Sequence, residues 1–280
     1  KNVGTSKTIT TTGYSISGAG AGNYTLTQPT PTANITVATL TVSGATTTNK
    51  IYDGTTVATT SGGSFTGVLS GDSVNLTHNS ATFSQAEVGT SITVTSNISS
   101  TGTDGANYTV TQPSGLTADM TQKTVTISGL TANNKAYDGN TTTTLSGTAT
   151  LNGVITADVS NVSLGGTPTA DFNDATVGTN KPVTISGYTI SGSASGNYNL
   201  VQPTGLTADI TSIAVPVITS ALTFSSVYGT VASVYTITAS NSPTSYNASG
   251  LPTGLSINTT NGEITGTSSA SIGNYNVSIT

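Results

Sequence analysis

Asn107-Tyr108-Thr109-Val110, which continues into Gln112-Pro113, decides the fold because the same pattern returns along the chain. Its general form is Asn-Tyr-x-aliphatic, and it stands at Asn23–Leu26, Asn107–Val110, Asn197–Leu200 and Asn274–Val277. The tyrosines are 84, 90 and 77 positions apart. Self-similarity at a fixed period indicates a tandem array, and about 85 residues are enough for a small domain with its own core. The sequence therefore predicts a string of modules.

The repeated motifs set the boundaries of four predicted modules. Two complete copies contain Lys-x-Tyr-Asp-Gly (Lys50–Gly54, Lys135–Gly139) and close on Leu-Thr-Ala-Asp-Met/Ile-Thr (Leu116–Thr121, Leu206–Thr211). The modules are a half repeat (residues 1–36), repeat two (37–121), repeat three (122–211) and a different last module (212–280). Because the half repeat matches only the second half of a copy, we expect it to be unstable alone and the chain to be a window on a longer polypeptide.

Alternation of apolar and polar residues predicts β-strands throughout. Ile92/Val94, Tyr108/Val110 and Tyr198/Leu200 are examples, and no segment shows a helical period. Short strands between Gly- and Asn-rich turns are typical of antiparallel β-sandwiches. The recurrent tyrosine resembles the strand-F tyrosine of immunoglobulin-type sandwiches, whose hydroxyl bonds back to the backbone, with an aliphatic residue in place of the cysteine two positions later.

The boundaries between the modules contain no predicted linker. No Gly/Ser-rich or Pro-rich spacer stands at 36/37, 121/122 or 211/212. Flexible spacers let domains tumble, and these junctions leave little slack. The predicted fold is all-β: tandem immunoglobulin-like antiparallel β-sandwiches, each with its own core, arranged end to end as a rod.

The composition excludes several classes of protein. The chain has 6 Lys+Arg, all of them Lys, 11 Asp+Glu and a net charge of −5. It therefore lacks the clustered cations that binding of nucleic acid or of a membrane surface requires. No apolar run reaches the about 18 residues of a spanning helix, so we expect no membrane insertion by this segment. The absence of cysteine removes disulfides, zinc–thiolate sites and thiol catalysis, and fits an extracellular protein of a bacterial surface better than one of an animal.

The residues that could carry chemistry are few, and none predicts a catalytic, cofactor or metal site. His78 is the single histidine and has no counterpart in repeat three, so we expect a structural or solvent-facing role. Asp171-Phe172-Asn173-Asp174 offers oxygens to Ca²⁺, but repeat two lacks the aligned acids, and the segment is expected to be mainly structural. Tyr52-Asp53-Gly54 and Tyr137-Asp138-Gly139 fit a tight turn with an anchored tyrosine better than a ligand site.

Sugar stacking and glycosylation stay open as smaller alternatives. Most of the 11 Tyr occupy repeated positions, which leaves Tyr228, Tyr235 and Tyr246 for stacking on a sugar. Asp72-Ser73-Val74 fits the Asp-Ser/Thr-aliphatic pattern of bacterial O-glycosylation.

Two parts of the chain resemble known families. Lys-x-Tyr-Asp-Gly with the later Asn-Tyr-x-Leu/Val-x-Gln-Pro resembles the YDG-type repeat of large bacterial adhesins, although Asn140 stands where repeat two has Thr55. The last module, through Ser245–Ser256 and Asn261–Thr267, resembles the bacterial "putative Ig" domain, a cadherin-like sandwich. This resemblance implies a very large secreted cell-surface protein of the kind common in Bacteroidota, where some are exported by type 9 secretion and serve gliding motility. Neither family brings catalytic residues or a cofactor.

We therefore expect a structural stalk segment of a secreted bacterial cell-surface adhesin, which displays a distal adhesive tip in attachment or gliding motility. Its expected partners are neighbouring repeats of the same longer chain, and ligands on a cell surface or substratum that bind outside this segment. The alternative is a carbohydrate- or host-protein-binding Ig-like module that acts directly. No enzyme is expected, since nothing supplies an acid–base pair held in a pocket.

Overall fold

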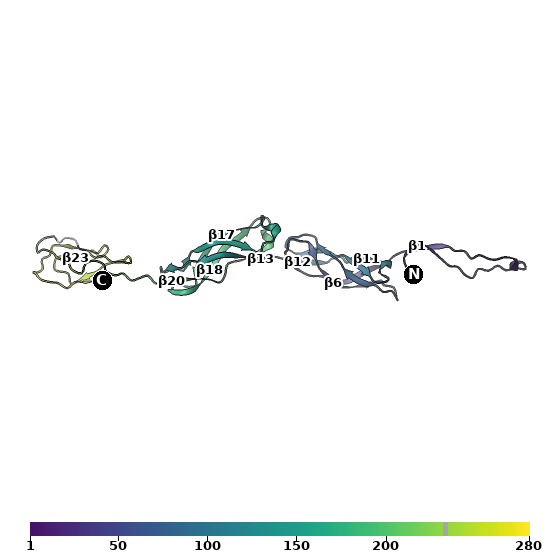
Figure 1. Ribbon diagram of the computed structural model, residues 1–280, viewed down its shortest axis with the longest axis horizontal. Helices are drawn as coiled ribbons and strands as arrows, with labels where there is room; N and C mark the ends of the chain where they lie inside the picture. Colours follow the sequence, from purple (N-terminus) through teal and green to yellow (C-terminus); the bar gives the residue numbers. More distant parts are fainter. Residues whose placement is uncertain (232–234) are drawn as a thin grey trace. The chain divides into compact units, whose positions relative to one another are not determined.

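The computed structural model describes residues 1–231 and 235–280, and these residues form β-strands and single-turn 3₁₀ helices (Figure 1). β-Branched residues favour the pleated backbone, and the alternation in the sequence places every second side chain inside. Ile92 and Val94 of β9 (Gly89–Thr95) are both buried, for example. The expected all-β class is confirmed. No helix in the described ranges is long and apolar enough to cross a membrane.

Repeat two is a β-sandwich of short strands. One sheet has the order β11-β3-β6, the other has the order β4-β12-β9-β8-β5, and β7 pairs with β10. The remaining bounds are β3 Ala38–Thr47, β4 Lys50–Ile51, β5 Val57–Ala58, β6 Thr60–Thr66, β7 Asn75–His78, β8 Ala81–Phe83, β10 Ile98–Thr101, β11 Tyr108–Thr111 and β12 Thr117–Thr121.

Two strand pairs of repeat two run parallel, a detail that the sequence did not predict. β11 pairs with β3, with Tyr108 opposite Ala38, and β12 pairs with β4, with Met120 opposite Lys50. The chain leaves one sheet after β3 and joins the other at β4, so the start of the repeat lies beside its end in both sheets. The ladders β3–β6 and β9–β12 are antiparallel, as expected.

Repeat three has the same topology with longer strands. Its sheets have the orders β16-β13-β19 and β14-β20-β18-β17-β15, and the pairs β13–β19 and β14–β20 are again parallel. The two ladders β7–β10 and β8–β9 of repeat two correspond to the single ladder β17–β18 here. The bounds are β13 Lys123–Ala132, β14 Lys135–Ala136, β15 Thr142–Thr143, β16 Leu145–Asn152, β17 Ser163–Phe172, β18 Gly178–Ser191, β19 Tyr198–Val201 and β20 Leu206–Thr211.

The chain divides into two compact units, and the division passes through repeat three. The first unit holds Lys1–Leu130, Gly147–Thr169 and Ile185–Thr204. The second unit holds Thr131–Ser146, Ala170–Thr184 and Gly205–Thr280. Repeat two therefore groups with part of repeat three in one unit.

The main hydrophobic core of the first unit contains side chains of both repeats. Its buried members are Tyr52, Ala58, Ala81, Phe83, Ile92, Val94, Ala118 and Met120 of repeat two, and Val125, Val162 and Tyr198 of repeat three. One residue, Gln122, separates β12 from β13, so Met120 and Val125 are close enough along the chain to fill one interior. The prediction that each repeat has its own core needs one correction: no sheet is shared between the two repeats, but this side-chain cluster crosses their boundary. Repeat three also buries hydrophobic residues outside the cluster, namely Ala170, Phe172, Val183, Ala208 and Ile210.

The half repeat forms one hairpin, in which β1 (Gly4–Thr8) pairs with β2 (Thr32–Ile35). Its recurrent tyrosine, Tyr24, is 75% exposed, whereas the equivalent Tyr108 and Tyr198 are buried. A shallow hollow beside Tyr24 is lined by Ile16 and Leu26. Their counterparts in repeat three, Ile190 and Leu200, pack against the core. The exposed apolar side chains are those that a second sheet would cover, and the expected instability of this half stays a prediction.

The last module has short strands in the sheets β21-β24-β23 and β22-β25. Their bounds are β21 Tyr235–Thr236, β22 Ala248–Ser249, β23 Leu255–Ile257, β24 Glu263–Gly266 and β25 Ser278–Ile279. Gly262, with φ +74°, lies in the turn of the hairpin β23–β24, which confirms the turn predicted at Asn261-Gly262. The Tyr275 hydroxyl donates to the carbonyl oxygen of Ser271 at 2.8 Å, the bond expected of a strand-F tyrosine.

Residues 212–217 form no strand, which differs from the direct junction predicted after Thr211. The first backbone pairing of the last module joins Ile218 and Ala239. Ile213, Val215 and Val217 are exposed. Pro216 lacks the backbone N–H that a ladder needs, which explains why the chain does not continue as a strand there.

Candidate functional site

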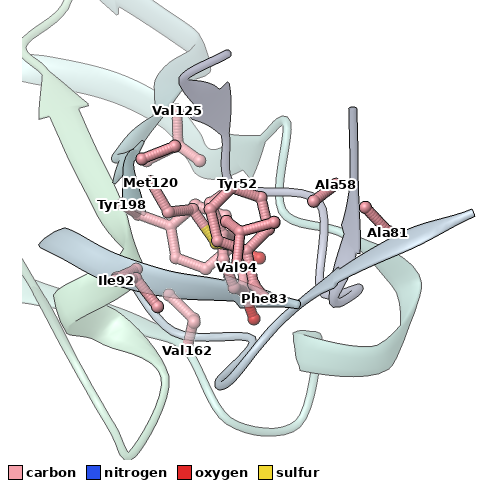
Figure 2. Packing of buried hydrophobic residues seen from close by; sticks show 11 residues of the cluster. Tyr52, Ala58, Ala81, Phe83, Ile92, Val94, Met120, Val125, Val162 and Tyr198 are labelled. Atoms are coloured by element: carbon pink, nitrogen blue, oxygen red, sulfur yellow. The ribbon is translucent and has the colours of Figure 1, made fainter. Parts of the chain in front are cut away.

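A buried polar cluster joins repeats two and three inside the first compact unit. The Tyr52 hydroxyl of repeat two and the Tyr198 hydroxyl of repeat three both donate to Oδ2 of Asp158, each at 2.7 Å. The two rings meet edge to face, with centroids 5.5 Å apart, beside Met120 (Figure 2). Tyr52, Asp158 and Tyr198 are only 6%, 8% and 3% exposed. We call these three residues the junction cluster.

Secondary structure fixes each member of the junction cluster. Asp158 ends the 3₁₀ turn η3 (Thr156–Asp158), and Tyr198 is the first residue of β19. The backbone N–H of Ile155 donates to the Tyr198 hydroxyl at 3.2 Å, which supplies the backbone bond predicted for this tyrosine. Tyr52 follows β4 and is held by its own N–H, which donates to the carbonyl oxygen of Thr121 at 2.9 Å. A carboxylate that accepts two hydroxyls can satisfy both in a site closed to water.

The Lys-x-Tyr-Asp-Gly motif forms the turn that presents Tyr52. The Lys50 ammonium contacts Asp53 at 2.7 Å and also donates to the carbonyl oxygen of Val57 at 3.0 Å. Asp53 in turn accepts the backbone N–H of Thr55 at 2.9 Å, as in an Asx turn. Because this bond uses the backbone, a different side chain is tolerated at that position in repeat three. The predicted turn-plus-anchor role is therefore what the structure shows, but the anchor lies on the next repeat.

The same turn forms in repeat three without burial of its tyrosine. Lys135 contacts Asp138 at 2.7 Å, and Asp138 accepts the backbone N–H of Asn140 at 2.9 Å. Tyr137 is nevertheless 44% exposed. The turn is thus built by its own residues, and contact with another repeat is not needed to form it.

The glycine of the turn also packs against repeat three. Gly54 and Gly139 both have positive φ, +76° and +79°. A Cβ on Gly54 would lie 2.5 Å from Cδ1 of Ile155, whereas a Cβ on Gly139 would meet no atom within 4 Å. The two glycines share one backbone conformation and differ in the neighbour.

Gly54→Ala is expected to destabilise the first compact unit more than Gly139→Ala destabilises the unit that contains it. Both substitutions carry the cost of a Cβ at positive φ, about 1–2 kcal/mol. Only Gly54→Ala adds the contact with Ile155, for about 1 kcal/mol more, since the methyl group can partly move away. Urea unfolding followed by tyrosine fluorescence measures both losses, and equal losses would contradict the contact.

A second hydrogen bond joins the repeats beside the junction cluster. The backbone N–H of Val88 in repeat two donates to Oδ1 of Asn197 at 3.0 Å. The half repeat makes the same bond to repeat two, where the N–H of Val3 donates to Oδ1 of Asn107 at 2.9 Å. Both acceptors are the asparagine of the recurrent Asn-Tyr, and both donors are the valine of a Val-Gly pair. The asparagine therefore has a repeated role in joining one repeat to the next.

The junction cluster keeps its tyrosines protonated. Burial is the largest cause that raises the pKa of Tyr52 to about 12, and the hydrogen bond to Asp158 is the second. The same two causes, in the same order, raise the pKa of Tyr198. A pKa that is raised on folding stabilises the folded state below the pKa of the unfolded chain. This contribution is lost as the pH rises through the folded value.

The junction is expected to hold below pH 10 and to open as the pH rises from about 10 to about 12. Ultraviolet absorbance of tyrosinate should show a late phase that belongs to Tyr52 and Tyr198. Asp158→Asn should move this phase to lower pH, and Tyr52→Phe should reduce its amplitude. A late phase that neither substitution changes would contradict the assignment.

A comparison with known protein families identifies the family of these repeats. The family described as YDG domain matches residues 1–33, 36–115 and 121–205. The chain belongs to the YDG domain family. The family described as Putative Ig domain matches residues 210–280, after the YDG repeats. A comparison with curated protein sequences finds no match.

The glutamine of the YDG repeat holds a neighbouring strand. Oε1 of Gln112 accepts the N–H of Ile98 at 2.8 Å, and its Nε2 donates to the carbonyl oxygen of Ile98 at 2.7 Å. Gln202 makes the same pair of bonds to Tyr188, at 3.1 and 2.9 Å. The Gln-Pro of repeats two and three is therefore structural.

The other candidate residues of the YDG repeats also have structural partners. His78 lies between the Thr60 hydroxyl and the carbonyl oxygen of Gly62, each at 2.9 Å. Asp174 pairs with the Lys181 ammonium. This pairing is the largest cause that lowers the pKa of Asp174 to about 2, and the hydrogen bonds donated by Thr176 contribute less. A carboxylate paired with a lysine is a poor ligand for the suggested Ca²⁺. Among the described residues, no group of three His, Cys, Asp or Glu side chains could hold a metal ion.

Asp158 is the site residue that the sequence analysis missed. It closes Gly153-Val154-Ile155-Thr156-Ala157-Asp158, which aligns with Gly67-Val68-Leu69-Ser70-Gly71-Asp72 of repeat two. This second shared motif could have identified the aspartate as a repeated position. Its partners lie far apart in sequence, so no spacing rule could have paired it with Tyr52.

Proposed function

We propose that this segment is a structural stalk of a secreted bacterial cell-surface adhesin, located outside the cell, which holds an adhesive tip away from the surface in attachment or gliding. The observation that supports this most is the junction that recurs: the asparagine of one YDG repeat accepts a backbone N–H of the repeat before it at two successive boundaries. A repeated junction gives each repeat a defined contact with the next, which is what a stalk requires.

Carboxylates and tyrosines of the repeats are engaged in contacts within the protein, which favours the same proposal. The carboxylates of Asp53, Asp138 and Asp158 are engaged in turns or in the junction cluster. Tyr52 and Tyr198 are buried against each other, so their rings offer no face to a sugar. These polar side chains thus serve the fold, and an enzyme is not proposed.

Small-angle X-ray scattering of the chain tests the stalk. A compact domain of 280 residues has a radius of gyration of about 19 Å. A stalk should give a clearly larger value, which Tyr52→Ala should change by loosening one junction. A compact particle would contradict the proposal. Strong binding of the wild-type chain on a glycan array would favour the alternative, a carbohydrate-binding module.

A further inference from the structure

We propose that repeat two carries a preformed socket for the Tyr-Asp-Gly turn of a complete YDG repeat placed before it. The socket consists of Asp72, Tyr108, Leu69 and Asn107. This inference rests on the proposed function, because it extends the junction seen between repeats two and three to the other side of repeat two.

The socket of repeat two matches that of repeat three atom by atom. The Tyr108 hydroxyl donates to Oδ2 of Asp72 at 2.6 Å, and the N–H of Leu69 donates to the Tyr108 hydroxyl at 3.1 Å. The corresponding distances in repeat three are 2.7 Å, from Tyr198 to Asp158, and 3.2 Å, from Ile155 to Tyr198. Repeat three uses this arrangement to accept Tyr52.

The acceptor atom for an incoming tyrosine is the same in both sockets. In repeat three, Oδ2 of Asp158 accepts two hydroxyls. In repeat two, the Lys1 ammonium contacts the other oxygen, Oδ1 of Asp72, at 2.5 Å. Among the described residues, only the Tyr108 hydroxyl donates to Oδ2 of Asp72. A second hydroxyl can therefore bind there while Lys1 keeps its contact.

The hydrogen bond between Val3 and Asn107 already places the end of the preceding repeat where the turn requires it. Val3 and Asn107 are joined as Val88 and Asn197 are, so the half repeat sits on repeat two as repeat two sits on repeat three at this contact. The half repeat contains no Lys-x-Tyr-Asp-Gly, because that motif belongs to the first half of a copy. The turn is preformed as well, since the Tyr137 turn keeps its hydrogen bonds while its tyrosine is exposed.

Leu69 stands where repeat three has Ile155, and a second difference lies beside the two sockets. Repeat two has Asp104 where repeat three has Ala194, which packs beside the core. Oδ2 of Asp104 accepts the N–H of Ser73 at 2.9 Å, and its Oδ1 contacts Lys1 at 3.0 Å. This carboxylate is therefore satisfied within repeat two and by Lys1, and it does not need the donor that Asp72 can accept.

The first test completes the half repeat. A copy of residues 37–85 is fused before Lys1, because Ala86 aligns with Lys1, and this adds a copy of the Tyr52 turn. Amide hydrogen exchange of Leu69 is compared between this extended chain and a version in which the added tyrosine is phenylalanine. The phenylalanine is expected to speed exchange about 10- to 150-fold, the loss of one hydrogen bond to a charged group. Asp72→Asn should abolish most of this difference.

A second variant keeps the test decisive if the extended chain does not fold. In the present chain, Ile155→Leu with Ala194→Asp gives the socket of repeat three the residues of repeat two. Tyr52→Phe should then still speed exchange of the amide at position 155 about 10- to 150-fold. Loss of that effect only in the changed socket would overturn the proposal, as would an added tyrosine that makes no difference to Leu69. Either result would leave the Tyr52–Asp158 junction and the stalk standing, whereas compact scattering would reject the stalk alone.

Discussion

Tyr52→Ala is expected to lower the free energy of unfolding of the first compact unit by about 3–5 kcal/mol, the usual cost of removing a large buried aromatic side chain. The ring fills the core between the repeats beside Met120 and Tyr198, and its hydroxyl donates to Asp158. Removal therefore leaves a cavity and takes one donor from a buried carboxylate. Urea unfolding followed by tyrosine fluorescence measures the loss, since the chain contains no tryptophan.

Tyr137→Ala is the matched control for this substitution. It removes the same residue from the same turn in repeat three, where the tyrosine is exposed. Exposed substitutions away from special backbone sites usually change stability by less than about 0.5 kcal/mol. Similar losses for the two variants would mean that Tyr52 acts only within its own turn.

Asp158→Ala is expected to destabilise the same unit by about 3–5 kcal/mol. It removes the acceptor of two buried hydroxyls, and a hydrogen bond to a charged group contributes about 1.5–3 kcal/mol. The Tyr52 and Tyr198 hydroxyls would then lie in a core that offers them no equivalent partner. The midpoint of urea unfolding measures this loss as well.

Asp72→Ala controls for the part of this loss that lies within one repeat. Asp72 accepts the equivalent tyrosine, Tyr108, but receives no hydroxyl from the half repeat among the described residues. Its removal should cost about half as much, and the difference between the two variants is the contribution of Tyr52. A loss as large as that of Asp158→Ala would contradict the inter-repeat bond.

The fold class could be predicted because the information is local. Alternation in Ile92/Val94 and the Asn261-Gly262 turn depend on residues that are adjacent in the chain, and both predictions hold. The parallel pair β3–β11 depends on where the chain crosses between sheets, which no local pattern encodes. The core cluster that crosses the boundary between the repeats was missed for a related reason. A buried Val125 looks the same in sequence whether it covers its own sheet or the end of the preceding repeat.

Only part of the candidate site could be predicted from the sequence. Tyr52 was expected to anchor the turn on the core, which is correct, and its partner was missed because Asp158 lies 106 positions away in another repeat. The equivalence of Tyr52 and Tyr137 in sequence also hid their different surroundings, one buried and one exposed. A repeated motif identifies a position, but its contacts depend on the neighbour that packs against it.

A double-mutant cycle between Tyr52 and Asp158 tests most directly whether the Tyr-Asp-Gly turn of one repeat is held by the next. Free energies of unfolding are measured for the wild type, Tyr52→Phe, Asp158→Ala and the double variant. A direct bond between the repeats predicts a coupling of at least about 1 kcal/mol, since residues in contact couple by about 0.5–3 kcal/mol. Losses that add within about 0.5 kcal/mol, as they do for distant sites, would contradict that bond.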